Sequence, residues 1–251
     1  MTVFALHFSP TGSTKKIAER IASQMSQSFV SVDLSVQTPE RHAFSPDDIA
    51  VFALPVFVGR IPAKAAEALR LCEGSGTPAV TVAVFGARAV EDALLETNDI
   101  LTERGFKTLA SAAFVAEHSV VRSVAAGRPD AEDLKEIDGF SRSALEKITR
   151  KDVSPPAVPG NRPYREAPST GVAPTVSDAC VKCGLCAREC PAAAIPLAAP
   201  NTTDASKCFM CMRCVRICPV GARSLPAPVL AHVSELLAKT VRGRTLNAVY
   251  L

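Results

Sequence analysis

The sequence predicts two domains: an α/β domain with a doubly wound, five-stranded parallel sheet, and a smaller α+β domain that follows it. Three observations support this division. Strand-like and helix-like segments alternate through residues 1–150, residues 151–175 are rich in proline and glycine, and eight of the nine cysteines lie between Cys180 and Cys218. Alternating strands and helices form parallel sheets that helices cover on both faces.

The first domain can be divided into elements by its hydrophobic periodicity. Apolar, β-prone runs predict strands at residues 2–8, 29–34, 49–56, 78–85 and 106–116. Helical spacing of apolar residues predicts helices at 15–27, 62–71, 89–104 and 129–149. Pro62 stands at a helix start, where its missing N–H costs nothing. Five strands within about 116 residues favour an open sheet over a barrel.

The overall composition is that of a globular protein. The chain has 251 residues, of which 47% are hydrophobic and 21% are charged, which excludes disorder throughout. No apolar run approaches the roughly 18 residues that a membrane-spanning helix needs. The first residues lack the basic start of a signal peptide, so we expect a cytoplasmic protein.

The composition changes near residue 150. Residues 1–150 carry a net charge of −3 and residues 151–251 a net charge of +6. The segment 151–175 lacks periodicity and is expected to be a linker, which places the second domain at 176–226. The tail, 227–251, is expected to be helical and to pack against a domain or across a homodimer interface, because apolar residues recur there at helical spacing. These residues are Leu230, Val233, Leu236, Leu237 and Val241.

Two cysteine runs in the second domain share the pattern C-x2-C-x2-C-x3-C-P. The first run is Cys180, Cys183, Cys186 and Cys190. The second lies 28 positions further on, at Cys208, Cys211, Cys214 and Cys218. Such a repeat indicates one structural unit used twice. The pattern is typical of bacterial [4Fe–4S] sites, in which the fourth cysteine of each run ligates the other cluster.

The spacing also predicts the ligand sets. Three closely spaced cysteines can surround three corners of a cubane cluster, and proline after the fourth cysteine directs the chain away from its own site. The expected ligands of the first cluster are Cys180, Cys183, Cys186 and Cys218. Those of the second cluster are Cys208, Cys211, Cys214 and Cys190.

Structural zinc and a disulfide framework are the weaker alternatives. Zinc usually takes two separated C-x2-C pairs, and disulfides are typical of secreted chains. Cys72 lies outside the repeat and is interpreted as a buried or half-buried free thiol. Residues 176–226 resemble the bacterial two-cluster ferredoxins in both motifs.

Three loops follow strands of the predicted sheet, at residues 9–14, 55–61 and 85–92. Open parallel sheets bind ligands beyond the carboxyl ends of their strands. The first loop, Ser9-Pro-Thr-Gly-Ser-Thr14, combines hydroxyl groups with a helix N-terminus and can bind a phosphate. It has neither the Walker nor the dinucleotide-binding glycine pattern, and a Ser/Thr-rich helix cap is the alternative.

The first loop resembles the FMN-phosphate loop of flavodoxins, whose T-x-T-G-x-T pattern it matches with serine in the first position. The other two loops are similar to the second and third flavin-contacting loops. Together with the cysteine repeat, the chain resembles the EFR1-type ferredoxins, in which a flavodoxin domain precedes a two-cluster ferredoxin domain. The resemblance implies a flavodoxin-like fold, one FMN and two [4Fe–4S] clusters. The residues that it implies at FMN are Ser9, Thr11, Gly12, Ser13, Thr14, Pro55, Val56, Phe57, Val58, Gly59, Arg60, Phe85, Gly86, Ala87, Arg88 and Asp92.

The chain departs from flavodoxins in the aromatic and charged residues of these loops. It has no tryptophan, and its two tyrosines, Tyr164 and Tyr250, lie outside the loops, so Phe57 is expected to stack on the flavin. Arg60 and Arg88 stand where flavodoxins tend to be acidic. The hypothesis is that both stabilise the reduced, anionic flavin by Coulomb attraction; the alternative is that both point into solvent.

Two histidines are also candidates for a role. His118, with Ser119, follows the fifth strand on the ligand side and is interpreted as ordering its loop, with proton donation to the flavin as the alternative. His7 lies within the first strand and is interpreted as a packed core residue.

A flavin exchanges one or two electrons, and each cluster exchanges one. We therefore expect an intracellular electron-transfer protein of anaerobic metabolism, which passes electrons between two [4Fe–4S] clusters and an FMN and serves redox partner proteins. The alternative is an FMN-dependent reductase or oxidase that acts on a small molecule or a quinone. The basic residues of the second half are interpreted as balancing cluster charge and contacting an acidic partner rather than nucleic acid.

Overall fold

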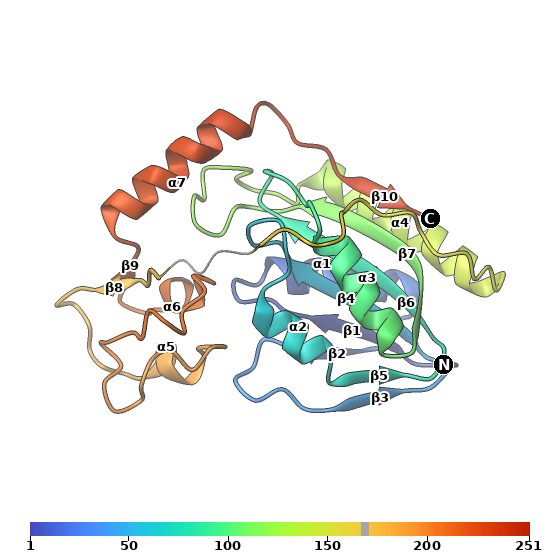
Figure 1. Cartoon of the computed structure of the whole chain (residues 1–251), viewed down its shortest axis with the longest axis horizontal. Coiled ribbons are helices and arrows are strands. Elements are labelled where there is room, and N and C mark those ends of the chain that lie inside the picture. The colour runs from blue at the N-terminus through green and yellow to red at the C-terminus, as the bar shows by residue number, and fades with distance from the viewer. Residues whose placement is uncertain (167–170) are drawn as a thin grey trace.

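The central sheet of the first domain contains the five expected parallel strands. A computed structural model describes residues 1–166 and 171–251. The strands are β1 (Val3–His7), β2 (Phe29–Asp33), β4 (Ile49–Pro55), β6 (Thr77–Phe85) and β7 (Phe106–Val115). They lie in the order β2-β1-β4-β6-β7, which places the switch in strand order between β1 and β4 (Figure 1). This order is that of a flavodoxin-like sheet.

The prediction of a five-stranded, all-parallel sheet is wrong in one respect. A sixth strand, β10 (Ala248–Tyr250), pairs antiparallel with β7 at the edge of the sheet. Its three residues come from the end of the tail at 227–251, which was expected to be helical. The tail forms helix α7 (Ala227–Thr240) and then returns in extended form to the first domain (Figure 1).

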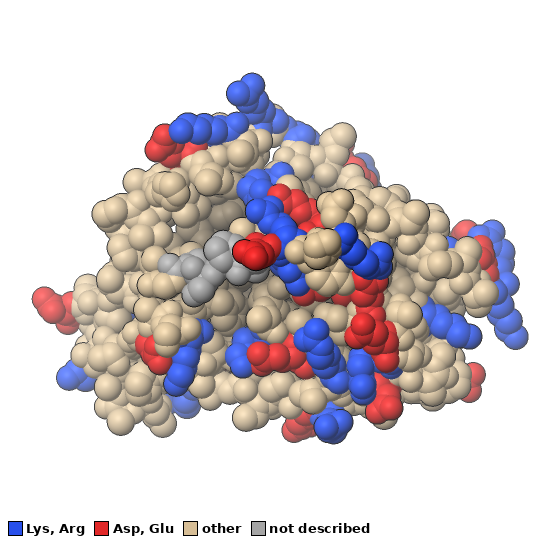
Figure 2. Space-filling model, in the orientation of Figure 1, with Lys and Arg blue, Asp and Glu red and all other residues tan. Residues whose placement is uncertain are grey.

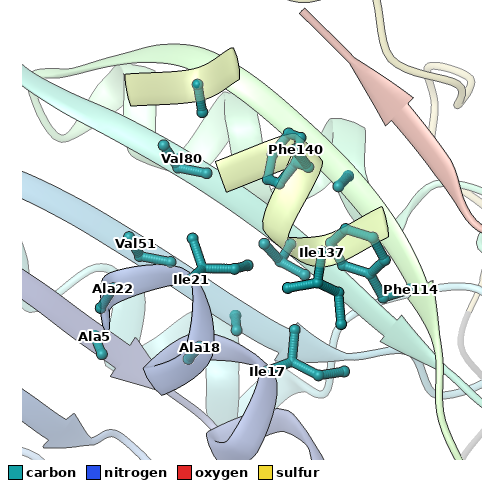
Figure 3. Packing of buried hydrophobic residues seen from close by; sticks show 14 of the residues in the cluster. Ala5, Ile17, Ala18, Ile21, Ala22, Val51, Val80, Phe114, Ile137 and Phe140 are labelled. Atoms are coloured by element: carbon teal, nitrogen blue, oxygen red, sulfur yellow. The ribbon is translucent and has the colours of Figure 1, made fainter. Parts of the chain in front are cut away.

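Helices cover both faces of the sheet, as the alternation of elements predicts. On one face, α1 (Ser13–Met25) and α4 (Ala131–Thr149) enclose a core that includes Ile17, Ile21 and Ile137 (Figure 3). On the other face, α2 (Ala63–Leu69) and α3 (Ala93–Glu103) pack over β4 and β6. Every residue of β4 is buried, as expected of a central parallel strand.

A short parallel pair, β3 (His42–Phe44) and β5 (Cys72–Gly74), lies outside the main sheet and was not predicted. Cys72 is a free, fully buried cysteine, which confirms its interpretation. Burial raises the pKa of its thiol to about 12, so the thiol stays neutral and unreactive.

The segment expected to be a linker is attached to the first domain in its described part. The backbone N–H groups of Asn161 and Arg165 donate to the Asp92 carboxylate at 2.9 and 2.7 Å. Tyr164 and Arg162 both donate to Asp99 on α3. Residues 167–170 of the expected linker lie outside the described residues.

The second domain is small and internally repeated. It contains the antiparallel pair β8 (Thr175–Val176) and β9 (Arg223–Ser224), and two single-turn helices, α5 (Leu185–Arg188) and α6 (Arg213–Arg216). Each short helix follows a residue in left-handed conformation, Gly184 or Met212. These two residues are 28 positions apart, so the repeat in the sequence is also a repeat in the backbone.

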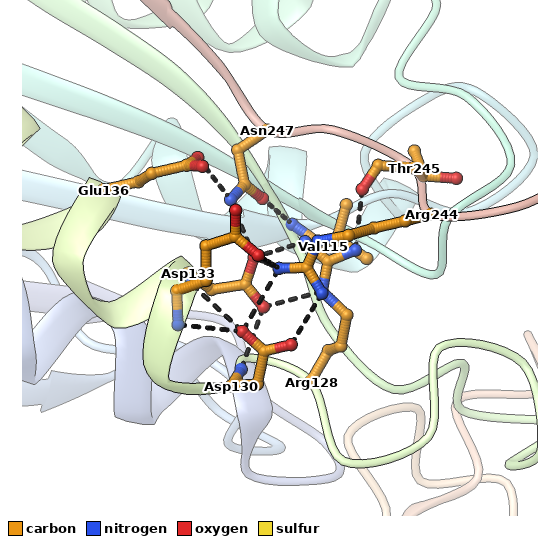
Figure 4. A network of polar contacts seen from close by, with 9 residues as sticks. Val115, Arg128, Asp130, Asp133, Glu136, Arg244, Thr245 and Asn247 are labelled. Carbon is orange, nitrogen blue, oxygen red and sulfur yellow. Dashed lines mark hydrogen bonds and ion pairs between the residues drawn. The ribbon is translucent and has the colours of Figure 1, made fainter.

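A polar network joins the end of the chain to α4 (Figure 4). Asp130 and Asp133 form the capping box of α4, and Arg128 and Arg244 pair with them. Asn247 donates to Asp133 at 2.8 Å and accepts from the N–H of Val115 at 2.9 Å. This network holds the returning tail in place beside β7.

Two properties of the whole chain complete the description. Basic and acidic side chains are interspersed over the face shown in Figure 2. Among residues 1–166 and 171–251, no helix is both long enough and apolar enough to span a bilayer.

Candidate functional site

A pocket opens at the carboxyl ends of β1, β4, β6 and β7, where the sequence predicts a ligand. Three groups of residues from the predicted loops line it, together with a fourth loop after β7 and one residue of the second domain. The lining residues are Pro10, Thr11, Ser13, Thr14, Pro55, Val56, Phe57, Val58, Gly59, Val84, Phe85, Gly86, Arg88, Ala89, Ala116, Glu117, His118, Ser119 and Cys211.

The first loop is shaped as an anion-binding helix start. Gly12, at φ 94°, reverses the chain in a left-handed conformation that favours glycine, and α1 begins at the next residue. The Ser9 hydroxyl accepts from the N–H of Lys15 at 2.9 Å, which closes the loop over the first turn. The first N–H groups of a helix lack partners within it and attract negative charge. The loop therefore fits the phosphate of FMN without any basic side chain.

The second loop is a tight turn that presents Phe57 to the pocket. Phe57 and Arg60 exchange backbone hydrogen bonds of 2.8 and 3.1 Å, with Val58 and Gly59 between them at φ 52° and 80°. Two central residues with positive φ define a type I′ turn. A Cβ atom at Gly59 would overlap the Glu91 carboxylate, so this turn also requires glycine to approach the third loop.

Three of the residues expected at FMN have other contacts in the structure. The Arg60 guanidinium lies against α3, where it donates to both oxygens of Glu96 at 2.7 Å and packs 4.6 Å from the ring centre of Tyr164. Asp92 accepts the linker N–H groups described above. Ala87 accepts from the Thr245 hydroxyl through its carbonyl. None of the three is among the residues that line the pocket, and neither are Ser9 and Gly12, which shape the first loop.

Arg88 does line the pocket, and it does not extend freely into solvent. Its guanidinium donates to both oxygens of Glu91, at 3.2 and 2.8 Å, and the Glu91 carboxylate also pairs with Arg165. Hydrogen bonds from these arginines lower the pKa of Glu91. Arg88 is therefore the loop cation placed to act on a ligand in the pocket.

His118 packs against the third loop and is held in one orientation. Its Nδ1 accepts from the N–H groups of Val120 and Val121 at 3.2 and 3.0 Å. Gly86 lies so close that a Cβ there would overlap the imidazole ring. Burial, and then the Arg88 charge, lowers the pKa of His118. The neutral ring therefore carries its proton on Nε2 and orders its own loop through Nδ1.

His7 is a core residue, as interpreted from the sequence. Its side chain is 1% exposed, and its Nε2 shares a hydrogen bond of 3.2 Å with the Ser31 hydroxyl. Burial lowers the pKa of the ring, which outweighs the opposing charge of Asp33.

The eight repeated cysteines surround two cavities in the second domain. Each cavity combines three cysteines of one run with the last cysteine of the other. Cys180, Cys183, Cys186 and Cys218 line one cavity. Cys190, Cys208, Cys211 and Cys214 line the other. These are the groupings that the spacing predicts, and their assignment to two clusters stays a prediction.

The sulfur environments suit bound metal clusters. Burial raises the pKa of the Cys211 thiol to about 12 and that of Cys214 to about 11, so thiolates there need a nearby positive charge such as iron. Backbone N–H groups also point at the sulfurs. Ala194 donates to Cys190 at 3.3 Å and Ala222 donates to Cys218 at 3.2 Å. Such bonds stabilise thiolate ligands and are matched between the repeats.

The cavity of Cys190, Cys208, Cys211 and Cys214 lies directly against the first domain. Cys211 is also part of the pocket lining. Phe209, between two cysteines of the second run, places its ring 6.2 Å from Phe8 and 6.0 Å from Phe57, centre to centre. Nothing in the sequence pattern indicates this contact, because the residues are more than 150 positions apart.

Arg213 fastens the two domains together beside this contact. Its buried guanidinium donates to the carbonyls of Ser9, Pro10 and Ser35 and to the Ser35 hydroxyl, at 2.7–3.3 Å. Asp33 lies 3.5 Å from it across the interface. From the sequence, the basic residues of the second half are interpreted as balancing cluster charge and contacting an acidic partner, so this role of Arg213 between the domains is not predicted. Its acceptors lie 178 or more positions away in the chain, beyond the reach of any local pattern.

Comparisons with known proteins agree with the two-part architecture. The family model of the flavodoxin domain matches residues 5–90, and that of the 4Fe-4S dicluster domain matches residues 179–222. No curated protein matches the chain.

Several solved structures are similar to the first domain. The apo form of an NADH:FMN oxidoreductase shares 14% identity over 58% of this chain and 89% of its own, with a TM-score of 0.44. Oxidised flavodoxin 1 from Bacillus cereus shares 14% identity over 58% of this chain and 98% of its own, with a TM-score of 0.42. An archaeal flavodoxin shares 14% identity over 59% of this chain and 99% of its own, with a TM-score of 0.37.

The chain thus contains a flavodoxin domain followed by a 4Fe-4S dicluster domain. A flavodoxin domain implies FMN, and the second domain implies 4Fe-4S clusters. Together these domains support a flavoprotein with iron–sulfur centres that takes part in electron transport.

Proposed function

We propose that this protein is an EFR1-type ferredoxin that carries electrons between two [4Fe–4S] clusters and one FMN within a single chain. FMN supplies one- and two-electron chemistry when bound, whereas each cluster supplies single electrons. The chain would therefore join one-electron carriers to a two-electron site.

The observation that carries this proposal is the position of Cys211. This cysteine lines the cavity of the second cysteine set and also the pocket formed by the three flavodoxin loops. A cluster ligand at the wall of the flavin pocket would keep the two centres within electron-transfer reach. Cys208, Cys211, Cys214 and Cys190 would then hold the inner cluster.

The first cysteine set would hold the outer cluster. Cys183 of this set is exposed, whereas Cys211 and Phe209 of the second set lie at the flavodoxin domain. The outer cluster would therefore exchange electrons with partner proteins, and the inner cluster would connect it to FMN. The partners are expected to be redox proteins in the cytoplasm, with no contribution from nucleic acid.

The test begins with protein purified without air, on which iron, sulfide and FMN are quantified together with a visible spectrum. We expect about eight iron atoms and one FMN per chain, from two four-iron clusters. Eight iron atoms without FMN, even after FMN is added, would overturn the flavin part of the proposal. Four iron atoms per chain would contradict the presence of a second cluster.

A second experiment tests the order of the centres. The Cys183→Ser and Cys211→Ser variants each remove one proposed ligand, one from the outer set and one from the inner set. Loss of the inner cluster should block reduction of FMN by electrons that enter through the outer cluster. If reduction of FMN were blocked in Cys183→Ser and normal in Cys211→Ser, the proposed assignment of the inner and outer clusters would be reversed.

A second candidate function is an FMN-dependent reductase or oxidase that acts on a small molecule or a quinone. The observation in its favour is that Glu117, His118 and Ser119 line the pocket beside Arg88, so polar groups face a ligand there. Catalytic turnover of quinones by the fully loaded protein, abolished by His118→Ala, would favour this candidate over a simple carrier.

A further inference from the structure

Arg223 is a buried cation inside the second domain. It is 3% exposed, and its guanidinium donates to the carbonyls of Pro200 and Thr202 at 2.6 and 3.3 Å and to the Thr203 hydroxyl at 2.8 Å. All of these acceptors are neutral. In the described part of the chain, no carboxylate forms an ion pair with it, whereas Arg213 is paired with Asp33 and Glu189.

A buried charge without an opposite charge is costly, because it gives up its hydration. Hydrogen bonds to neutral oxygens recover only part of that cost. The position of Arg223 therefore calls for negative charge nearby, and the carboxylates of the described residues do not supply it.

Both cysteine sets lie next to Arg223. The residue lines the cavity of Cys180, Cys183, Cys186 and Cys218. Its Nη2 and the Cys186 thiol share the Pro200 carbonyl as acceptor, at 2.6 and 3.6 Å. On the other side, Arg223 donates to the Thr203 hydroxyl at 2.8 Å, and Thr203 lines the cavity of Cys190, Cys208, Cys211 and Cys214. Arg223 thus lies between the two proposed cluster sites.

The internal repeat shows that the fold does not need a cation at this position. Arg223 lies 28 residues after Ile195, so the two occupy equivalent places in the two repeats. Ile195 is 4% exposed and packs in the apolar core of the small domain. An isoleucine therefore serves in one repeat where an arginine is buried in the other.

We propose that Arg223 is the shared counter-cation of the two clusters and raises the reduction potential of both. An oxidised cluster with four thiolate ligands carries a charge of about −2, and reduction adds one more negative charge. A buried cation favours the more negative, reduced form of each cluster. This inference rests on the proposed function, since it requires both clusters to be present.

The test is a potentiometric titration of the anaerobically purified protein, followed by electron paramagnetic resonance, with iron counted on each sample. In Arg223→Ile, which copies the other repeat, we expect both midpoints to become more negative. The expected change is at least tenfold in the reduction equilibrium, equivalent to 59 mV for one electron. Arg223→Lys keeps the charge, so both midpoint potentials should stay close to those of the unmodified protein.

Arg216→Met is the matched control. Arg216 is exposed and belongs to the second cysteine run. Its replacement by methionine removes one positive charge, as Arg223→Ile does, but from the surface. Its effect on the midpoints should be small and should vanish at high salt, whereas the effect of Arg223→Ile should persist.

Three outcomes would overturn the inference, and a fourth would overturn the proposed function. Unchanged midpoints in Arg223→Ile with full iron content would overturn the inference, and so would equal shifts in Arg223→Ile and Arg216→Met. If Arg223→Ile binds no iron, Arg223→Gln is compared with Arg223→Lys, and equal midpoints in these two variants would also overturn it. Absence of the clusters from the unmodified protein would instead overturn the proposed function.

Discussion

Arg60 and Arg88 start from adjacent loops of the pocket, but their guanidinium groups lie in different places. Arg60 is held against α3 by Glu96, whereas Arg88 lines the pocket beside Glu91. The sequence alone treats them as equivalent, because a loop position does not say which carboxylate a long side chain will reach. The hypothesis of a cation that acts on the reduced flavin therefore narrows to Arg88.

Comparison of Arg88→Ala with Arg60→Ala tests this narrower hypothesis. We expect Arg88→Ala to make the flavin midpoint more negative, because the reduced anion loses a nearby cation. Arg60→Ala should leave the midpoint unchanged and lower Tm, because Glu96 is left buried without its partner. An equal effect of both substitutions on the midpoint would contradict the structural distinction between them.

The buried histidines make stability depend on pH. Burial lowers the pKa of both His7 and His118 below the value of about 6.5 that each ring has in the unfolded chain. Below pH 6.5 the unfolded state therefore binds more protons than the folded state. The free energy of unfolding consequently decreases as the pH is lowered. Urea titrations between pH 7.5 and 5.5 should show this decline, and His118→Gln should make it shallower. A slope that His118→Gln leaves unchanged would show that His118 does not contribute.

Most long elements could be predicted from periodicity, and the short ones could not. The five parallel strands and four helices of the first domain lie within a few residues of their predicted bounds. Strands β3, β5 and β10 have three residues each, too few to show a period. Their pairing partners are distant in sequence, and only the folded chain shows them.

Asn247, directly before the C-terminal strand β10, joins the tail to β7 and α4. Asn247→Ala would leave the N–H of Val115 and the carboxylates of Asp133 and Glu136 without this partner. We expect a loss of about 1–3 kcal/mol in stability, seen as a lower Tm. Leu246→Ala is the control, because Leu246 is 74% exposed. If both substitutions changed Tm equally, the network in Figure 4 would have little importance for stability.

At the scale of the whole molecule, the domain contact decides whether the two proposed redox sites stay close together. The cysteine spacing and the loop patterns predict each site by itself, but not their juxtaposition. Arg213 makes that juxtaposition specific, since it joins the second cysteine run to the Ser9 and Pro10 carbonyls of the first loop.

Arg213→Ala should therefore loosen the domain contact. We expect reduction of FMN through the clusters to slow by roughly tenfold or more, because hydrogen bonds from a charged donor are lost at a buried interface. Arg216→Ala, in the same short helix but exposed, is the control. Stopped-flow reduction together with small-angle scattering checks the prediction. A normal rate with an unchanged scattering profile would contradict it.

The return of β10 to the flavodoxin sheet has a consequence for how the small domain is connected. The small domain is tethered at both ends, through the segment before Thr175 and through the chain after Thr240. Cutting one tether would leave the other in place and maintain a high effective concentration of the second domain at the pocket. The strand pairing of β10 thus attaches the small domain to the first domain a second time. A chain cleaved once in either connection should still hold its cysteine motifs close to the flavodoxin domain.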